Sequence, residues 1–257
     1  MKYSKLIVWS TIIAIWFLLT INQLNPDYTG NAYIPNPYLV ILKLFEIIRE
    51  GYYGISLFKH IGSSFYRLLM AILLAIITAI PLGLLCGYYK KIEVFVSQIV
   101  NFLRPLPPLA YYTLIVLLVR SIDNEPKIIL LYIAAFCPLY IACVMAVRQV
   151  KKDHILSVKT LGASNLQIFR NVVLPSSLPN IITGLRTGVG VAYTTLVTAE
   201  IFAAESGLGF LIFYAYEVKQ DYASVFIGII IIGVSALLLD SLIKTIENKL
   251  VFWKGLA

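Results

Sequence analysis

The sequence predicts an all-α membrane protein, a bundle of helices that crosses the bilayer several times, and three features point to this class. Hydrophobic residues make up 60% of the 257 residues, whereas charged residues make up only 13%. The mean hydropathy is +0.85. Several apolar segments approach the ~20 residues that a helix needs to cross the hydrocarbon core. Because soluble domains carry about 25% charged residues, this composition argues against a soluble globular, disordered or coiled-coil protein.

The apolar segments predict six transmembrane helices. Five segments come close to or reach the required length: 6–21, 68–87, 128–147, 181–199 and 222–242. The sixth, 109–119, reaches it only if the helix begins inside the preceding proline-rich stretch, where proline is tolerated in a first turn. No small-x-small cleavage site follows segment 6–21, so we expect an uncleaved span rather than a signal peptide.

The distribution of basic residues predicts that both termini are cytoplasmic. With the N-terminus inside, 13 of the 21 Lys and Arg residues fall on the cytoplasmic side, and only Lys43, Arg49, Lys59 and Lys219 fall outside. Cytoplasmic loops of membrane proteins carry this kind of excess. We therefore interpret the net charge of +8 as a topology signal and not as a nucleic-acid-binding surface.

Residues 38–50 are too few to span the bilayer but suit an amphipathic helix at the outer membrane surface. Residues 43, 46 and 50 are charged and share one helix face, and Gly51 suits the position after the last turn.

The sequence contains no pattern for metal binding or catalysis. Cys86, Cys137 and Cys143 lie in apolar runs, which is typical of buried thiols, and His60 and His154 are far apart. The phosphate-binding loop of ATPases and the usual hydrolase motifs are missing. We therefore expect a non-catalytic chain without a cofactor of its own.

The connection 148–180 is longer than a simple turn between two spans requires. Its apolar residues predict two short helices that meet at Gly162, and Ser164 with Gln167 three residues later forms a capping-box pattern. Pro175 and Pro179 are expected to end the second helix and lead into the fifth span. The residues alone leave two alternatives equally open: packing on the chain's own spans, or docking of a cytoplasmic partner.

A resemblance favours the docking alternative. Gly162, nine further residues and Val172-Val173-Leu174-Pro175 resemble the G-x9-I-x-L-P half of the EAA loop in permease subunits of ABC importers. The stretches FLRPLPPLAYYTLIVLL and AEIFAAESGLGFLI are similar to the nitrate, sulfonate and taurine branch of that family. The sequence departs from the family where its Glu-Ala-Ala falls on Leu156-Ser157-Val158, and where Tyr111-Tyr112-Thr113 lacks a second proline.

The resemblance implies a type I ABC importer permease fold in a multi-pass protein of the bacterial inner (cytoplasmic) membrane. It implies one permease domain over 1–257, with the first span and external helix in 1–60, a core in 61–250 and a coupling loop in 148–180. The expected partners are a second permease subunit, as a homodimer or a heterodimer, two cytoplasmic ABC ATPases that bind ATP and magnesium, an external substrate-binding protein and the lipid bilayer. The residues expected to contact the ATPases are Lys159, Leu161, Gly162, Ala163, Phe169, Arg170, Leu174 and Pro175.

The same resemblance, together with charge in apolar segments, suggests residues of the pathway or gate: Tyr111, Tyr112, Arg186, Tyr193, Thr194, Glu200, Gly207 and Gly209. Each has a plainer alternative. Arg186 can extend to the interface, Glu200 can bind a neighbouring span, the hydroxyls can bond to their own helix, and the glycines can form a simple turn.

The remaining expectations concern helix packing, one ion pair and the substrate. Gly184 and Gly188 suit close helix packing, either within the chain or at a dimer seam, and Asp240 is expected to pair with Lys244. The resemblance implies that the substrate is a small anion such as nitrate, a sulfonate or taurine. Alternatives are a thiamine-precursor or other vitamin-like heterocycle and, as a different class, a self-contained channel or secondary transporter.

Overall fold

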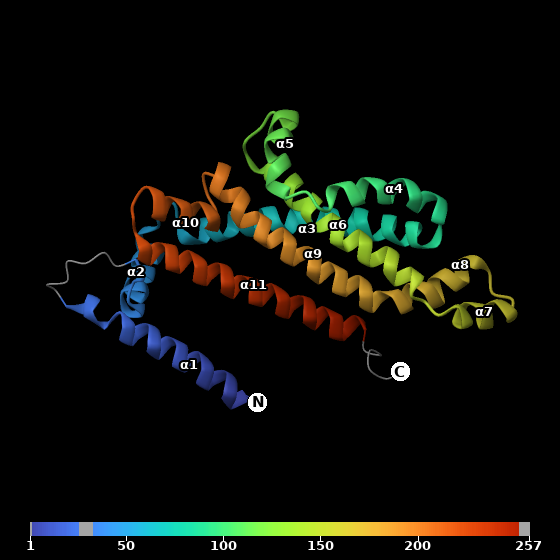
Figure 1. Cartoon of the computed structure of the whole chain (residues 1–257), viewed down its shortest axis with the longest axis horizontal. Coiled ribbons are helices and arrows are strands. Elements are labelled where there is room, and N and C mark those ends of the chain that lie inside the picture. The colour runs from blue at the N-terminus through green and yellow to red at the C-terminus, as the bar shows by residue number, and fades with distance from the viewer. Residues whose placement is uncertain (1, 26–32, 252–257) are drawn as a thin grey trace. The chain divides into compact units, whose positions relative to one another are not determined.

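The computed structural model describes residues 2–25 and 33–251, and the regular elements in these ranges are helices, as predicted. They are α1 Lys2–Leu19, η1 Ile21–Leu24, α2 Pro37–Glu50, α3 Leu57–Tyr88, α4 Lys90–Leu103, η2 Pro108–Tyr111, α5 Tyr112–Val119, α6 Asn124–Arg148, α7 Lys152–Thr160, α8 Asn165–Ile168, the π-helical segment Phe169–Val173, α9 Leu174–Ala203, α10 Leu208–Glu217 and α11 Tyr222–Leu250 (Figure 1).

Within the described residues, three helices are long and apolar enough to cross a membrane: α3, α6 and α11. A fourth crossing results if α4 and η2–α5, which meet at a bend of 96°, are taken together as one broken span. The apolar helical segments Ser10–Leu19 and Leu208–Glu217 are shorter. The polytopic class is therefore confirmed, whereas the count of six spans and the position of the termini stay predictions.

The proline-rich stretch explains the broken span. Helix α4 ends at Leu103, and a new helical segment starts at Pro108, inside that stretch as predicted. Each proline lacks the N–H that a helix interior requires, whereas a first turn leaves that N–H unpaired anyway. The sequence interpretation missed α4, because it assigned residues 90–104 to a cytoplasmic connection. The spacing of Ile92, Phe95 and Ile99 is typical of an amphipathic helix.

The chain forms two compact units, of which the first contains residues 1–64 and 200–234. Its core joins α2 to α10 and α11 through Val40, Ile47, Leu211, Ala215 and Ile227. The helix predicted at 38–50 is confirmed as α2.

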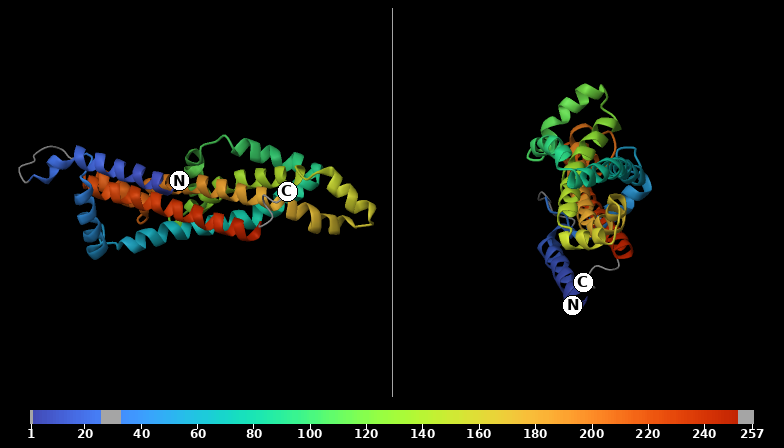
Figure 2. Two further views of the ribbon diagram at one scale, coloured as in Figure 1. Left: turned by 90° about the horizontal axis from the view of Figure 1, so that it is seen from below. Right: turned by 90° about the vertical axis from the view of Figure 1, so that its right-hand side faces the viewer.

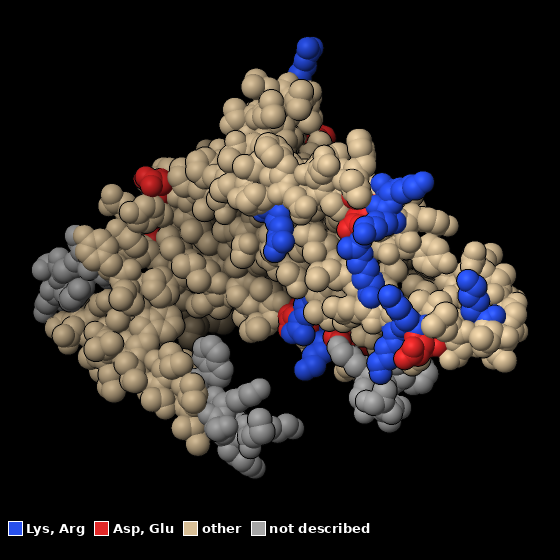
Figure 3. Space-filling view, turned by 45° about the vertical axis from the view of Figure 1, so that its right-hand side comes forward, with Lys and Arg blue, Asp and Glu red and all other residues tan. Residues whose placement is uncertain are grey.

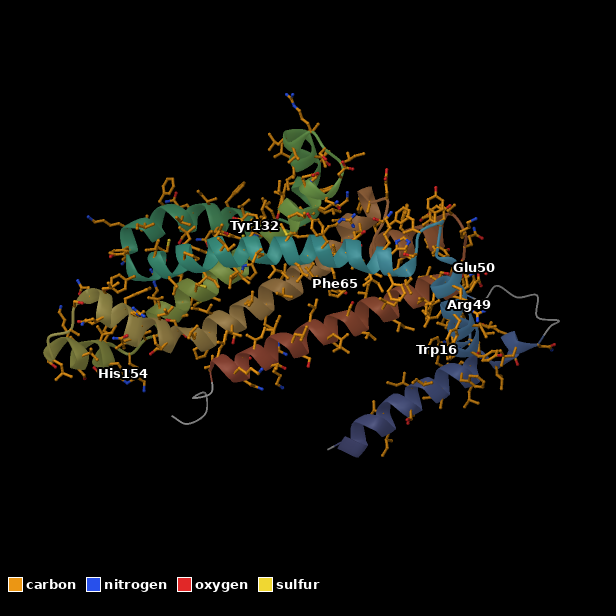
Figure 4. The ribbon with its side chains drawn as sticks, turned by 180° about the vertical axis from the view of Figure 1, so that it is seen from behind. Trp16, Arg49, Glu50, Phe65, Tyr132 and His154 are labelled. Carbon is orange, nitrogen blue, oxygen red and sulfur yellow. The ribbon has the colours of Figure 1, made fainter. Side chains whose placement is uncertain are left out.

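An ion-pair network and an aromatic stack add to this core. Lys43 of α2 lies 2.6 Å from Glu46 and 3.5 Å from Asp221, which precedes α11. Burial acts to lower the pKa of Lys43, but the hydrogen bond to Glu46 and the charge of Asp221 outweigh it and raise the pKa. Near the start of α2, Trp16 stacks on Phe226 with a ring separation of 5.5 Å (Figure 4).

The second unit contains residues 65–199 and 235–257 and is built around α6, whose side chains are buried along most of its length. A Cβ atom on Gly184 would lie 2.2 Å from that of Ala142, and one on Gly188 would lie 2.9 Å from the Ala135 carbonyl oxygen. The two glycines therefore serve close packing of α9 on α6 within the chain. Tyr132 of α6 accepts a hydrogen bond from Thr78 of α3 at 3.1 Å (Figure 4).

Candidate functional site: a docking loop and a lined cavity

Helices α7 and α8 form a hairpin beyond the ends of α6 and α9 in the second unit (Figures 1 and 2). The apolar side chains of Leu156, Leu161 and Leu166 are exposed to 57%, 85% and 74%. Lys159 and Arg170 are also exposed, whereas Ala163 is half-buried. Exposed leucines in a short polar hairpin are unusual unless another surface covers them.

The turn between the two helices has the local chemistry that the sequence predicted. Gly162 adopts φ +84°, a conformation that side chains disfavour, and its N–H donates to the Lys159 carbonyl at 3.0 Å. Ser164 and Gln167 form the predicted capping box at the start of α8. The hairpin is therefore a defined element and not a loose loop.

The expected helix end at Pro175 and Pro179 is wrong. The chain continues from α8 through the π-helical segment into α9, so Pro175 lies in the first turn of α9 and Pro179 lies inside it. The helix tolerates both residues because the fixed φ of proline is close to that of a helix. The wider π turn before α9 also changes which carbonyl oxygen each N–H meets, so the N–H that proline lacks matters less there.

Three of the remaining expected contact residues lie against this chain. The ring of Phe169 packs edge-on against Tyr88 of α3 with a centroid separation of 5.9 Å. Leu174 and Pro175 are half-buried at the start of α9. The surface left open for a partner is consequently centred on Leu161, Gly162 and Leu166.

Basic side chains gather on the part of the second unit where α4 begins and α7 and α8 lie (Figure 3). The basic residues in or next to these elements and the end of α6 are Lys90, Lys91, Arg148, Lys151, Lys152, Lys159 and Arg170. This positive surface agrees with a cytoplasmic position of the hairpin.

A cavity of about 520 Å³ opens between η2, α6 and α9 in the second unit. Its polar lining comes from Arg104, Tyr111, Gln149, Asn180, Thr183 and Thr187. The Asn180 side-chain amide donates to Gln149 Oε1 at 2.8 Å. Tyr111 therefore faces the cavity, whereas Tyr112 is buried and its hydroxyl has no hydrogen-bond partner among the described residues.

Arg186 and Asp240 form an ion pair between α9 and α11. The expected pairing of Asp240 with Lys244 is therefore wrong, because a guanidinium can hold the carboxylate with two hydrogen bonds. A second cavity of about 190 Å³ adjoins this pair and is also lined by Tyr193 and Thr194. Tyr193 hydrogen-bonds Ser235, and Thr194 donates to the carbonyl of Val191 in its own helix at 2.9 Å.

Glu200 is fully buried in the first unit. Its carboxylate accepts hydrogen bonds from the Ser64 hydroxyl at 2.8 Å and from the Gly209 N–H at 2.9 Å. The Ser64 oxygen in turn accepts from the Leu208 N–H at 2.9 Å, and the Gly207 N–H donates to His60 Nδ1 at 3.1 Å. Gly207 and Gly209 thus belong to a buried polar cluster that holds the first turn of α10.

Sequence reasoning missed His60, Ser64 and Arg104 as members of these sites. His60 and Ser64 lie one turn apart at the start of α3, but nothing local indicates a partner some 140 residues away. Arg104 could have been found, because it directly precedes the prolines that break the third span.

No group of three or more potential metal ligands occurs within residues 2–25 and 33–251.

A family profile described as "Binding-protein-dependent transport system inner membrane component" matches residues 79–251. The chain is 34% identical over 241 residues to the taurine transport system permease protein TauC of Escherichia coli, covering 93% of this chain and 85% of TauC. It is 32% identical to the putative aliphatic sulfonates transport permease protein SsuC of Bacillus subtilis, covering 97% and 87%. It is 31% identical to the nitrate import permease protein NrtB of Leptolyngbya laminosa, covering 94% and 88%.

Among solved structures, a chain of the MetNI methionine ABC transporter in an inward-facing conformation superposes with a TM-score of 0.64. The match covers 76% of this chain and 94% of that chain at 18% identity, so it shows the shared fold. Together with the profile and the relatives, it establishes that this chain is a polytopic inner-membrane permease subunit of the binding-protein-dependent ABC importer family, in the branch of the taurine, sulfonate and nitrate permeases.

Proposed function

We infer that this chain forms half of the translocation pathway of an importer and couples it to cytoplasmic ATPases through the α7–α8 hairpin. The observation that carries this proposal is the exposure of Leu161 and Leu166 beside the sharp turn at Gly162. Two exposed leucines on a rigid, basic-flanked hairpin suit a cleft on a soluble partner better than contact with water or with lipid.

The proposed partners are those of the importer family. Two ATPase subunits bind ATP and magnesium, so this chain holds no cofactor and performs no hydrolysis. A second permease subunit, here proposed as an identical copy, completes the pathway, and an external binding protein delivers the substrate. Closure of the ATPases draws the two hairpins together and tilts the attached helices α6 and α9 between two discrete arrangements.

The substrate that we propose is a small anion such as nitrate, a sulfonate or taurine. The names of the relatives support this class. Glu200, which would repel an anion in an open pathway, is fully buried and bound by Ser64 and Gly209.

The test is purification of the tagged chain from its native membrane in mild detergent, followed by identification of the proteins that purify with it. We expect an ATPase in stoichiometric amount. The variant Leu161→Ser/Leu166→Ser should reduce its recovery at least tenfold. Phe58→Ser, which also replaces an exposed apolar side chain but lies at the start of α3, should leave it unchanged. A chain that purifies alone and conducts solute in liposomes without ATP would overturn the proposal in favour of a self-contained transporter.

A further inference from the structure

Arg104 occupies the break between two half-helices of the third crossing. It follows the last residue of α4 and precedes the prolines that separate α4 from η2 and α5. Fourteen helical residues separate it from the turn at Tyr89, which is ~21 Å along the axis. It lines a cavity together with Ala134 and Cys137, which lie close to the midpoint of α6. Arg104 therefore lies deep within the crossing and not at its cytoplasmic end, where the sequence interpretation placed it.

Three other cations in the long helices of this unit have partners. Arg67 donates to Asn124 at 2.7 Å, and the Lys127 ammonium donates to the carbonyl oxygens of Ile122 and Asp123. Arg186 pairs with Asp240. In the part of the chain that the structure describes, the Arg104 guanidinium has neither a hydrogen-bond acceptor nor an ion-pair partner, and it is exposed.

A charge at this depth costs ~2.5–3.5 kcal/mol on insertion scales unless it faces protein or water. Arg104 faces the 520 Å³ cavity, and it is the single charged side chain among the described residues that line it. No carboxylate lies on the cavity wall to neutralise it. Tyr111, Gln149 and Asn180 line the same cavity and supply further polar hydrogens. This wall is electrostatically complementary to an anion and unfavourable for a cation.

We propose that Arg104 is an anion-binding residue of the translocation pathway, which receives a planar or tetrahedral oxyanion group such as nitrate or a sulfonate. A guanidinium presents two parallel N–H donors that match two oxygens of such a group. Discontinuous helices at mid-membrane are where transporters commonly place substrate-binding groups. This assignment rests on the proposed function, because it takes the cavity to be part of the pathway.

The test is uptake of ³⁵S-labelled taurine and of ¹⁵N-labelled nitrate by cells that express the full transporter with its ATPase and binding protein. Arg104→Gln should lower the maximal uptake rate at least tenfold, and Arg104→Lys should lower it less, because lysine restores the positive charge but not the paired N–H donors. Arg120→Gln is the matched control, since Arg120 ends the same broken span outside the cavity, and its uptake should stay within twofold of wild type.

The possible outcomes distinguish a failure of the Arg104 anion site, called the subsite below, from a failure of the proposed function. If the wild-type transporter imports neither anion, the proposed substrate class is wrong, and the subsite falls with it. If the wild type imports an anion and Arg104→Gln imports it equally well, the function stands and the subsite is refuted. Loss of the assembled complex from the membrane in Arg104→Gln would assign Arg104 a structural role and also refute the subsite.

Discussion

At the scale of single residues, Glu200 shows why a charge in an apolar segment does not by itself mark a pathway. The sequence places it near the end of a span and leaves two alternatives, a gate or contact with a neighbouring helix. Its partner Ser64 lies 136 residues away, so the pattern alone could not choose between them. Gly207 completes the cluster, because a Cβ atom there would lie within 2.4 Å of the Glu200 carboxyl carbon.

We predict that Glu200→Gln destabilises the protein without changing which solutes it imports. A buried carboxylate that accepts hydrogen bonds from Ser64 and Gly209 loses ~1.5–3 kcal/mol when its charge is removed. The melting temperature in detergent should fall by ~4–8 °C. Ser64→Ala should have a smaller effect that is not additive with the first, as expected of residues in contact. Additive losses would show that the two side chains do not act together.

At the scale of elements, apolar length predicted the positions of the long helices α3, α6 and α11, and local capping chemistry predicted the α7–α8 turn. Helix α4 and helix α10 were missed for physical reasons. α4 is amphipathic and begins with two lysines, so its composition resembles a cytoplasmic connection. α10 has only ten residues and is held by the distant cluster around Glu200, which no local pattern reveals. The cavity lining was equally hidden, because it combines three separate segments.

The hairpin turn gives a prediction at this scale. Gly162→Pro should leave the chain in the membrane at normal amounts but reduce transport by at least a hundredfold, because proline fixes φ near −65° whereas the turn requires +84°. Gly190→Ala is a suitable control, since a Cβ atom there meets no other atom within 4 Å. Immunoblots of membranes give the amount of protein, and labelled-taurine uptake gives the rate. Normal import by Gly162→Pro would refute the role of the turn in coupling.

At the scale of the whole molecule, the evidence for orientation comes from charge and not from helix count. Helices α3, α6 and α11 and the broken span α4–α5 account for up to four crossings among the described residues, and the sequence predicts two more at 6–21 and 181–199. α9 is not among the helices apolar enough to count as spans, because it carries Arg186 and several polar residues. The gathering of basic side chains near α7 and α8 agrees with the prediction that this end is cytoplasmic (Figure 3).

This orientation is testable with single cysteines and a membrane-impermeant maleimide. The native cysteines Cys86, Cys137 and Cys143 are buried, so the background labelling of the folded protein should be low. His154→Cys and Lys249→Cys should react only in inside-out vesicles, because both positions are exposed on the predicted cytoplasmic side. Tyr53→Cys, at a side chain that is 59% exposed, should react only in intact cells or right-side-out vesicles. Labelling of His154→Cys from outside would place the α7–α8 hairpin beyond the reach of a cytoplasmic ATPase, and the coupling proposal would fail with it.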